Sequence, residues 1–248
     1  MDRSLLFFLG LLGALCQAAP FPIAVGERLY YQIRVKGILA GEQTTVVTNR
    51  ERVDGVETWH LHSVTRSTGW VRSLYRLDDT FEAWIDTNRL LPVRARRSLR
   101  EGGWASDFDL AFDAVRRCVR YTPRGASAPS RTDAMEENTV ELLSLIYHLR
   151  GQTLAPGGVW RCAFWDYRGS SPFQVTLHEG RPVADIFGGS TNAVRTILVD
   201  ENLGPRIQIA LAPDYGNVPV RVTLPVFQVW KIGSIDVDGL LVEFRRGQ

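Results

Sequence analysis

The stretch Tyr75–Arg100, YRLDDTFEAWIDTNRLLPVRARRSLR, decides the fold class of this chain. It sets an acidic segment against an arginine-rich one across a short turn, which is typical of a β-hairpin. Strand alternation places Glu82 and Trp84 on one face, opposite the apolar residues Phe81, Ala83 and Ile85. The return strand brings arginines to the Glu82 face, namely Arg94, Arg96 and Arg100. Cross-strand ion pairs of about 0.2–1 kcal/mol each would explain these charges without catalysis.

Arg97 breaks this pattern, because alternation puts it on the apolar face with Val93, Ala95 and Leu99. Two explanations stay open. A bulge at Arg96 and Arg97 would return the side chain to solvent, whereas without a bulge Arg97 points inward and needs a carboxylate or an anionic ligand. We therefore take Arg97 as a candidate ligand-binding residue, together with the aromatic residues Trp84 and Tyr147.

The rest of the chain predicts mainly β structure. Residues 29–36 alternate cleanly, with Leu29, Tyr31, Ile33 and Val35 on one face. Many more short strands follow at even spacing, separated by Gly and Asp turns. The pattern favours a strongly curved antiparallel sheet, either an open barrel or a sandwich. Residues 122–133, rich in Pro, Ser and Ala, are predicted to be a loop.

One inserted helix is expected at about residues 136–150, because apolar residues there recur every three or four positions. They cover most of the helix circumference, so the helix is predicted to be buried on more than one side. Thr132 or Asp133 is the expected N-cap, and Gly151 ends the helix.

The start of the chain predicts export. An apolar run from Leu5 to Leu15 precedes Ala18 and Ala19, the layout of a signal peptide over residues 1–18. We expect a single β-rich domain over residues 19–248, without a transmembrane segment, in the periplasm. Cys16 leaves open a lipoprotein that is acylated at that cysteine.

The amino-acid composition disfavours one class of binding partner but does not indicate a function. The formal net charge is only +2, which disfavours nucleic-acid binding. After export two cysteines remain, Cys118 and Cys162, and the sequence leaves open whether they form a disulfide.

Four segments carry a family resemblance. They are Gly26–Tyr31 with Gly37–Gly41, Asp79–Arg100, Leu142–Arg150 and Val218–Arg221. In these landmarks the chain resembles the DUF3108 family. The resemblance implies an exported protein of a Gram-negative bacterium, of unknown function and without established catalytic residues.

No pattern in the chain establishes an enzyme or a cofactor. His60 and His62 share a strand face, but a metal site would need a third ligand such as His148 or His178. The acids Asp79, Glu82 and Asp86 would suit a carboxylate-based hydrolase only if two of them converged in a cleft.

Three hypotheses follow. The first is a non-enzymatic binding or carrier protein for a lipid or another hydrophobic envelope component. The second is a structural or assembly factor that contacts protein partners in an envelope complex. The third is an envelope hydrolase that uses carboxylates.

Overall fold

The computed structural model describes residues 23–125, 130–152, 157–166, 169–178, 195–199, 208–226 and 235–248. The segment 1–18, including Cys16, lies outside the described residues.

The described strands form one sheet of fifteen, in the order β8-β7-β6-β5-β4-β3-β2-β1-β15-β14-β13-β12-β11-β10-β9. Every neighbouring pair is antiparallel except β9 and β10. The first half comprises β1 (Arg28–Val35), β2 (Ile38–Val53), β3 (Val56–Ser67), β4 (Asp78–Asp86), β5 (Pro92–Glu101), β6 (Trp104–Asp113), β7 (Cys118–Pro123) and β8 (Arg131–Ala134). The second half comprises β9 (Thr139–Val140), β10 (Val159–Asp166), β11 (Gly169–His178), β12 (Arg195–Val199), β13 (Gln208–Ala212), β14 (Val218–Val226) and β15 (Ile235–Arg245).

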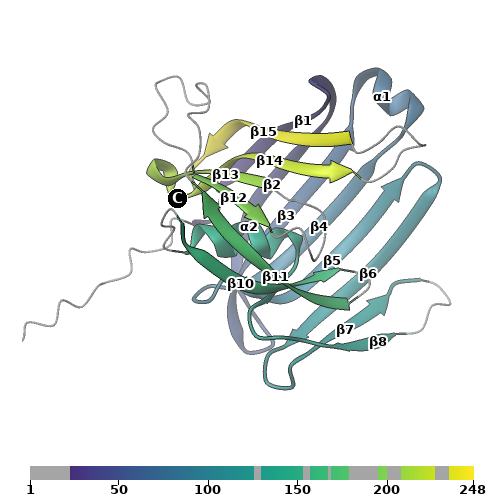
Figure 1. Ribbon diagram of the computed structural model, residues 1–248. Helices are drawn as coiled ribbons and strands as arrows, with labels where there is room; N and C mark the ends of the chain where they lie inside the picture. The colour runs from purple at the N-terminus through teal and green to yellow at the C-terminus, as the bar shows by residue number, and fades with distance from the viewer. Residues whose placement is uncertain are drawn as a thin grey trace, which may run out of the picture.

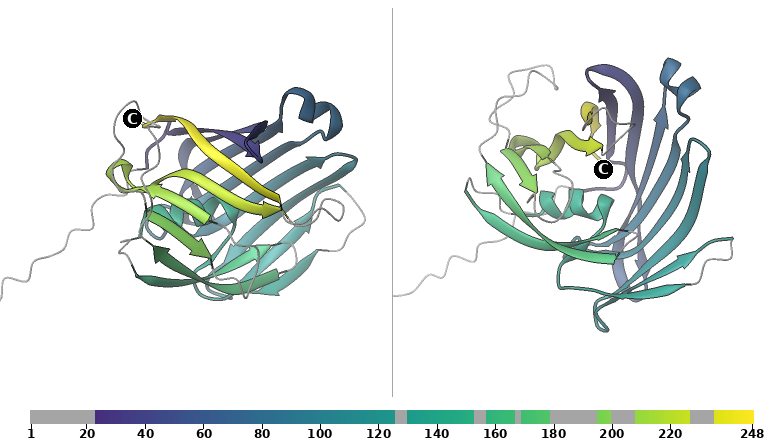
Figure 2. Two further views of the ribbon diagram at one scale, coloured as in Figure 1. Left: turned by 45° about the horizontal axis from the view of Figure 1, so that its top comes forward. Right: turned by 45° about the vertical axis from the view of Figure 1, so that its right-hand side comes forward.

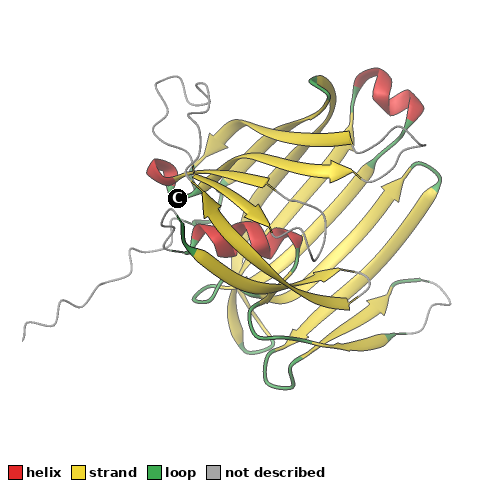
Figure 3. Ribbon diagram, in the orientation of Figure 1, coloured by secondary structure: helices red, strands yellow, loops and turns green. Residues whose placement is uncertain are grey.

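The sheet is a meander in which the first strand pairs with the last, β1 with β15. It curves strongly around one helix, α2 (Leu142–Arg150), which lies on its concave side (Figures 1 and 2). The predicted fold class, a strongly curved antiparallel sheet with a buried helix, is therefore confirmed. A second helix, α1 (Gly69–Leu74), and a 3-10 turn at Pro213–Tyr215 were not expected (Figure 3).

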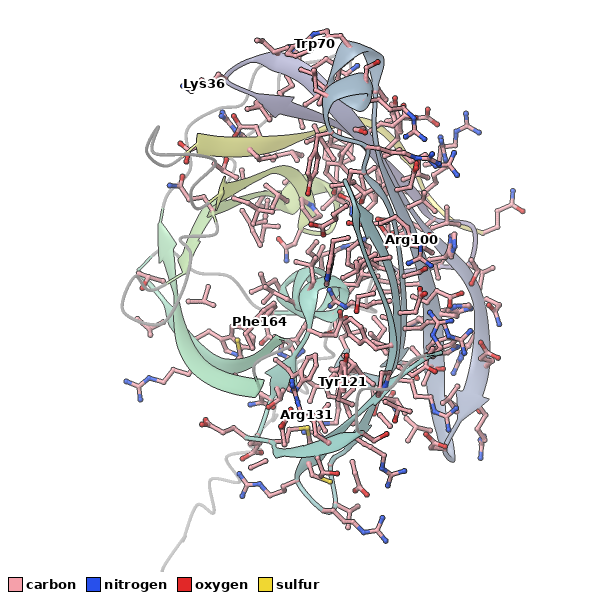
Figure 4. All side chains as sticks on the ribbon, turned by 90° about the vertical axis from the view of Figure 1, so that its right-hand side faces the viewer. Lys36, Trp70, Arg100, Tyr121, Arg131 and Phe164 are labelled. Carbon is pink, nitrogen blue, oxygen red and sulfur yellow. The ribbon has the colours of Figure 1, made fainter. Side chains whose placement is uncertain are left out.

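The sheet does not close into a complete barrel, because β8 and β9 are its two ends. Side chains bridge the seam between β8 and β10. The indole N–H of Trp165 donates to Asp133 at 3.2 Å, and the Arg131 guanidinium lies over the ring of Trp165 at 5.8 Å. Tyr121 and Arg131 both point toward the inside of the molecule (Figure 4).

Alternation explains how the strands bury one face. In β4 every second residue is buried, so Phe81, Ala83 and Ile85 face inward as predicted. Together with Val47 and Leu61 of the neighbouring strands, they pack against Leu143 and Tyr147 of α2. The helix is thus part of the core on the β2–β4 side and on the β10–β13 side alike.

The helix begins later than predicted. Glu141 is the N-cap, and its carboxylate accepts the backbone N–H groups of Leu143 and Ser144 at 3.2 and 2.7 Å. The Ser144 hydroxyl accepts the Glu141 N–H in return, which completes a capping box. Neither Thr132 nor Asp133 caps the helix, because the chain first forms β8 and β9. The predicted loop at 122–133 is therefore partly strand.

The strand connections divide between two ends of the sheet. We call the "α1 end" the one that carries α1, the β1–β2 turn and the β5–β6 turn. The "far end" carries the β2–β3, β4–β5 and β6–β7 turns. Helix α2 lies toward the far end, since the His148 ring bonds the Arg89 carbonyl of the β4–β5 turn at 2.9 Å (Figure 1).

Candidate functional site

The outer face of β4–β6 carries a ladder of ion pairs. Glu82 pairs with Arg96 across the strands, and Arg96 also bonds Asp109 at 3.0 Å. Arg100 pairs with Asp107 at 2.8 Å and projects from the same outer face (Figure 4). The prediction that these charges neutralise one another on one face is confirmed, and each exposed pair contributes little to stability.

Trp84 lies on this outer face and not on the concave side. Its ring stacks on His60 with centroids 4.3 Å apart, and its indole N–H donates to Glu51 at 2.7 Å. Burial lowers the pKa of His60, so its ring is neutral at pH 7. His62 shares this face, as predicted, but the described residues contain no cluster of three metal-ligating side chains. His178 lies in β11, and its side chain lies outside the described part of the chain.

Arg97 points inward without a bulge, because its pairing with Phe81 and Phe108 keeps a regular register. Its guanidinium donates to the buried N-cap Glu141 at 2.7 Å and lies over the Phe81 ring. Of the alternatives left open by the sequence, the inward ion pair is the one observed. The Arg97 Nε is buried and has no hydrogen-bond partner.

Tyr147 belongs to a buried polar network at the far end. Arg150 donates to both oxygens of Glu27 at 2.6 and 2.8 Å, and the Tyr147 hydroxyl donates to the same carboxylate at 3.2 Å. Both charged side chains are at most 1% exposed. Burial raises the pKa of Tyr147 well above its ordinary value, so the phenol stays protonated. Asn217 caps the helix end by donating to the Arg150 carbonyl at 3.1 Å.

Ion pairs therefore hold α2 at both ends, Arg97 with Glu141 at its start and Arg150 with Glu27 at its close. The signs suit the helix dipole, which favours an acid at the N-terminus and a base at the C-terminus. Sequence reasoning singled out Arg97 and Tyr147 but missed their partners. The signal that was available is the acid immediately before the apolar helix and the arginine at its last position.

The inward-facing side chains become more exposed to solvent toward the α1 end of the sheet. In β1, Leu29 and Tyr31 are buried, whereas Ile33 and Val35 are only half-buried. In β5, Ala95 is buried, whereas Leu99 is half-buried. The helix repeats this: Leu142 and Ile146, one turn apart, are its two partly exposed residues. Partly exposed apolar side chains thus remain on the concave side, and two of them, Leu99 and Leu142, lie close in sequence to Arg97 and its partner Glu141.

The candidate acids do not converge. Glu82 lies on the outer face, and Asp86 accepts the backbone N–H groups of Asn88 and Arg89 in the β4–β5 turn. Asp79 is buried on the inner face, beside Glu101. Burial raises the pKa of both Asp79 and Glu101, and Asp79 accepts the backbone N–H of Arg100 at 2.8 Å. The trio proposed for a hydrolase therefore forms no cleft.

Cys118 and Cys162 are both free, so the disulfide left open by the sequence is not formed. The reason is strand parity. Cys118 neighbours the buried Val119 and so faces outward from β7, whereas Cys162 is buried in the core beside α2. Burial raises the pKa of the Cys162 thiol to about 12.

The far end is hollowed by an open pocket of about 740 Å³. Its rim is formed by turns rich in charge, and several of these charges pair locally, including Arg94 with Asp54 and Arg116 with Asp113. The lining therefore mixes these paired charges with apolar side chains, among them Leu91, Phe112 and Met135.

This geometry defines a class of β-barrel-like proteins, in which an open antiparallel sheet wraps around a helix. The described residues form no recognised catalytic constellation. The chain belongs to the DUF3108 family of proteins of unknown function, whose model matches residues 30–235. The resemblance read from the sequence is thereby confirmed.

The solved structures support the fold. The chain is similar to a crystal structure from Brucella abortus, described as a beta-barrel-like protein of the domain of unknown function DUF1849. The TM-score is 0.58 at 13% identity, over 91% of this chain and 99% of that one. No curated protein matches the chain. Among the described helices, none has the length and apolar character to cross a membrane.

Proposed function

We propose that the protein is a non-enzymatic binding or carrier protein of the periplasm, which holds a hydrophobic ligand on the concave side of its sheet. The observation that carries the proposal is the apolar surface left partly uncovered there. Ile33, Val35 and Leu99 come from the sheet, and Leu142 and Ile146 come from α2. A ligand with an acyl chain would bury these side chains, at about 25 cal/mol for each Å² of apolar area removed from water.

Arg97 supplies the polar contact of the proposed ligand. Its side chain is 14% exposed, and one guanidinium nitrogen has no hydrogen-bond partner. A carboxylate or phosphate group at the head of an acyl chain would bind the exposed part of this guanidinium, beside its buried Nε. Glu141 keeps the guanidinium in place, because the same carboxylate is fixed by two backbone N–H groups of α2. The site would then combine an apolar wall with one oriented cation.

Export supports the periplasmic part of the proposal. The apolar run Leu5–Leu15 followed by small residues is the pattern of a signal peptide. Detection of the processed N-terminus in a periplasmic extract is the expected result, and exclusive recovery from the cytoplasm would contradict this part.

The proposal is tested by looking for a ligand that co-purifies with the protein. The protein is purified from the periplasm without detergent, and its lipid extract is analysed by mass spectrometry. We expect a near-stoichiometric hydrophobic species. Ile146→Trp should reduce it by filling the concave side, whereas Val242→Trp, which adds the same bulk at an exposed position of β15, should not. An empty wild-type protein that also takes up no fatty acid in vitro would refute the proposal.

A second candidate, an assembly factor, is favoured by the open seam. Among the described strands, β8 is the last on its side of the sheet, so its outer edge has no strand partner. Such an edge can accept an added strand from another protein. In-cell crosslinking from Thr132, an exposed residue of β8, would recover that protein, and the recovery of no protein would count against this candidate.

A further inference from the structure

The α1 end exposes a group of large apolar side chains that no described element covers. Trp70 and Leu74 of α1 are 60% and 77% exposed, and Trp104 at the start of β6 is 53% exposed. Tyr75, Ile38 and Leu39 are exposed as well. Scattered single apolar residues on a surface need no explanation, but a contiguous group of this kind marks an interaction site.

Hydrogen bonds between the three connections show that these residues form one surface. Thr68, which precedes α1, donates its backbone N–H to the Ala40 carbonyl at 2.9 Å, next to Leu39. On the other side, the Gly102 N–H donates to the Arg76 carbonyl at 2.7 Å, next to Tyr75. Figure 4 shows Trp70 and Lys36 at this same end of the molecule.

The helix does not need these side chains for its own packing. It has only six residues, no side-chain cap and no buried residue. Isolated helices of that length are marginal in water, and a helix that packs would bury Trp70 and Leu74 rather than expose them. The exposure of these side chains therefore indicates that they contact the surface of a partner.

The charges at this end indicate the chemistry of that partner. Lys36, Arg66 and Arg76 are exposed cations at this end, and Asp236 near the start of β15 is an exposed acid there. Asp78 is half-buried and bonds both Arg72 at 2.9 Å and Arg76 at 2.7 Å, so the charge of Arg76 is already paired. Among the described residues Lys36 forms no ion pair, at the tip of the β1–β2 turn.

We propose that the α1 end docks on the surface of a lipid bilayer that contains anionic headgroups. Tryptophan and tyrosine combine an apolar ring with a polar N–H or O–H, which suits the boundary between headgroups and acyl chains. Lysine and arginine around them pair with lipid phosphates. This proposal does not rest on the binding of a ligand on the concave side.

A probe that reports on one end of the molecule tests the orientation. An environment-sensitive fluorophore is attached to Ser73→Cys in α1 or, as the control, to Ala114→Cys in the exposed β6–β7 turn at the far end. Both are made with Cys16 and Cys118 replaced by serine, since Cys162 is buried. With phosphatidylcholine vesicles that contain phosphatidylglycerol, the probe at residue 73 should shift to the blue, and the probe at residue 114 should not.

Matched variants test the residues. Trp70→Ser and Leu74→Ser should each weaken vesicle binding about tenfold, whereas Val115→Ser, at a 94% exposed position of the far end, should leave it unchanged. Lys36→Glu should weaken binding to anionic vesicles only. Arg117→Glu is its control, because both residues have positive φ, are exposed and lack an ion pair in the described structure.

The proposal is overturned if neither probe shifts, if both shift alike, or if the Trp70 and Leu74 variants bind vesicles as the wild type does. It is also overturned if crosslinking from residue 73 captures a protein while vesicles have no effect, since a protein partner would then occupy this surface. Ile146→Trp should bind vesicles normally, so failure of the ligand proposal can be told apart from failure of this one.

Discussion

Replacement of Arg150 by methionine tests whether the buried ion pair at the end of α2 fixes the helix inside the sheet. The change removes the two bonds to Glu27, at 2.6 and 2.8 Å, and leaves a carboxylate that is 1% exposed. Removing one partner of a buried pair costs about 3–5 kcal/mol, because the other charge stays desolvated. Against a total stability of about 5–15 kcal/mol this is a large loss.

The double variant Glu27→Gln/Arg150→Met separates the cost of the stranded charge from that of the lost contacts. The glutamine carbonyl still accepts the Tyr147 hydroxyl, which now donates to Glu27 at 3.2 Å. No charge remains to be desolvated, so we expect the double variant to lose only about 1–3 kcal/mol. It should therefore be more stable than Arg150→Met alone.

The assay is urea unfolding followed by tryptophan fluorescence, with the midpoint compared at an unchanged m-value. Arg117→Met is the control, since Arg117 is exposed and has no ion pair in the described structure. The reasoning would be refuted by a loss below about 1 kcal/mol for Arg150→Met, or by a double variant that is no more stable than that single variant.

Three further predictions concern single groups. Glu141→Ala removes the N-cap and strands Arg97, so it should cost about 2–4 kcal/mol in urea unfolding; a loss below about 1 kcal/mol would contradict this. Burial raises the pKa of Asp79, so the folded state binds more protons than the unfolded state above the ordinary carboxyl pKa of about 4. The ionised group therefore costs stability as pH rises, and Asp79→Asn should raise stability at pH 7 and flatten its decline from pH 4 to 7; parallel profiles would count against it. The Cys162 thiol, whose pKa is raised to about 12, should not react with Ellman's reagent at pH 8 in the folded protein, whereas the partly exposed Cys118 should; a faster reaction at Cys162 would contradict its burial.

The sequence predicted the sheet well because strand alternation is local information. The inward face of β4 and the charged outer face of β4–β6 follow directly from parity. The resulting inward position of Arg97 was also foreseen as one of two alternatives. What decided between them was the distant Glu141, forty-four residues later.

The polar network and the helix start depended on contacts that local patterns do not encode. Glu27 precedes the first strand and Arg150 ends the helix, 123 residues apart. The apolar period predicts a helix from about residue 136, but Thr139 and Val140 pair with β10 as a strand, which delays the start to Leu142. Trp84 was predicted on the correct face, but without the tertiary structure its stacking partner His60 could not be assigned.

The two ends of the molecule differ in a way that links both proposals. Helix α2 lies toward the far end, where the Glu27, Tyr147 and Arg150 network is fully buried. Toward the α1 end the inward side chains of β1 and β5 lose cover, and the exposed aromatic residues lie at that same end. If the α1 end docks on a bilayer, the exposed part of the concave side faces the lipid. An acyl chain would then pass between the bilayer and the concave side without crossing water. A protein that binds vesicles through Trp70 but whose ligand content is unchanged by Ile146→Trp would separate the two events and break this link.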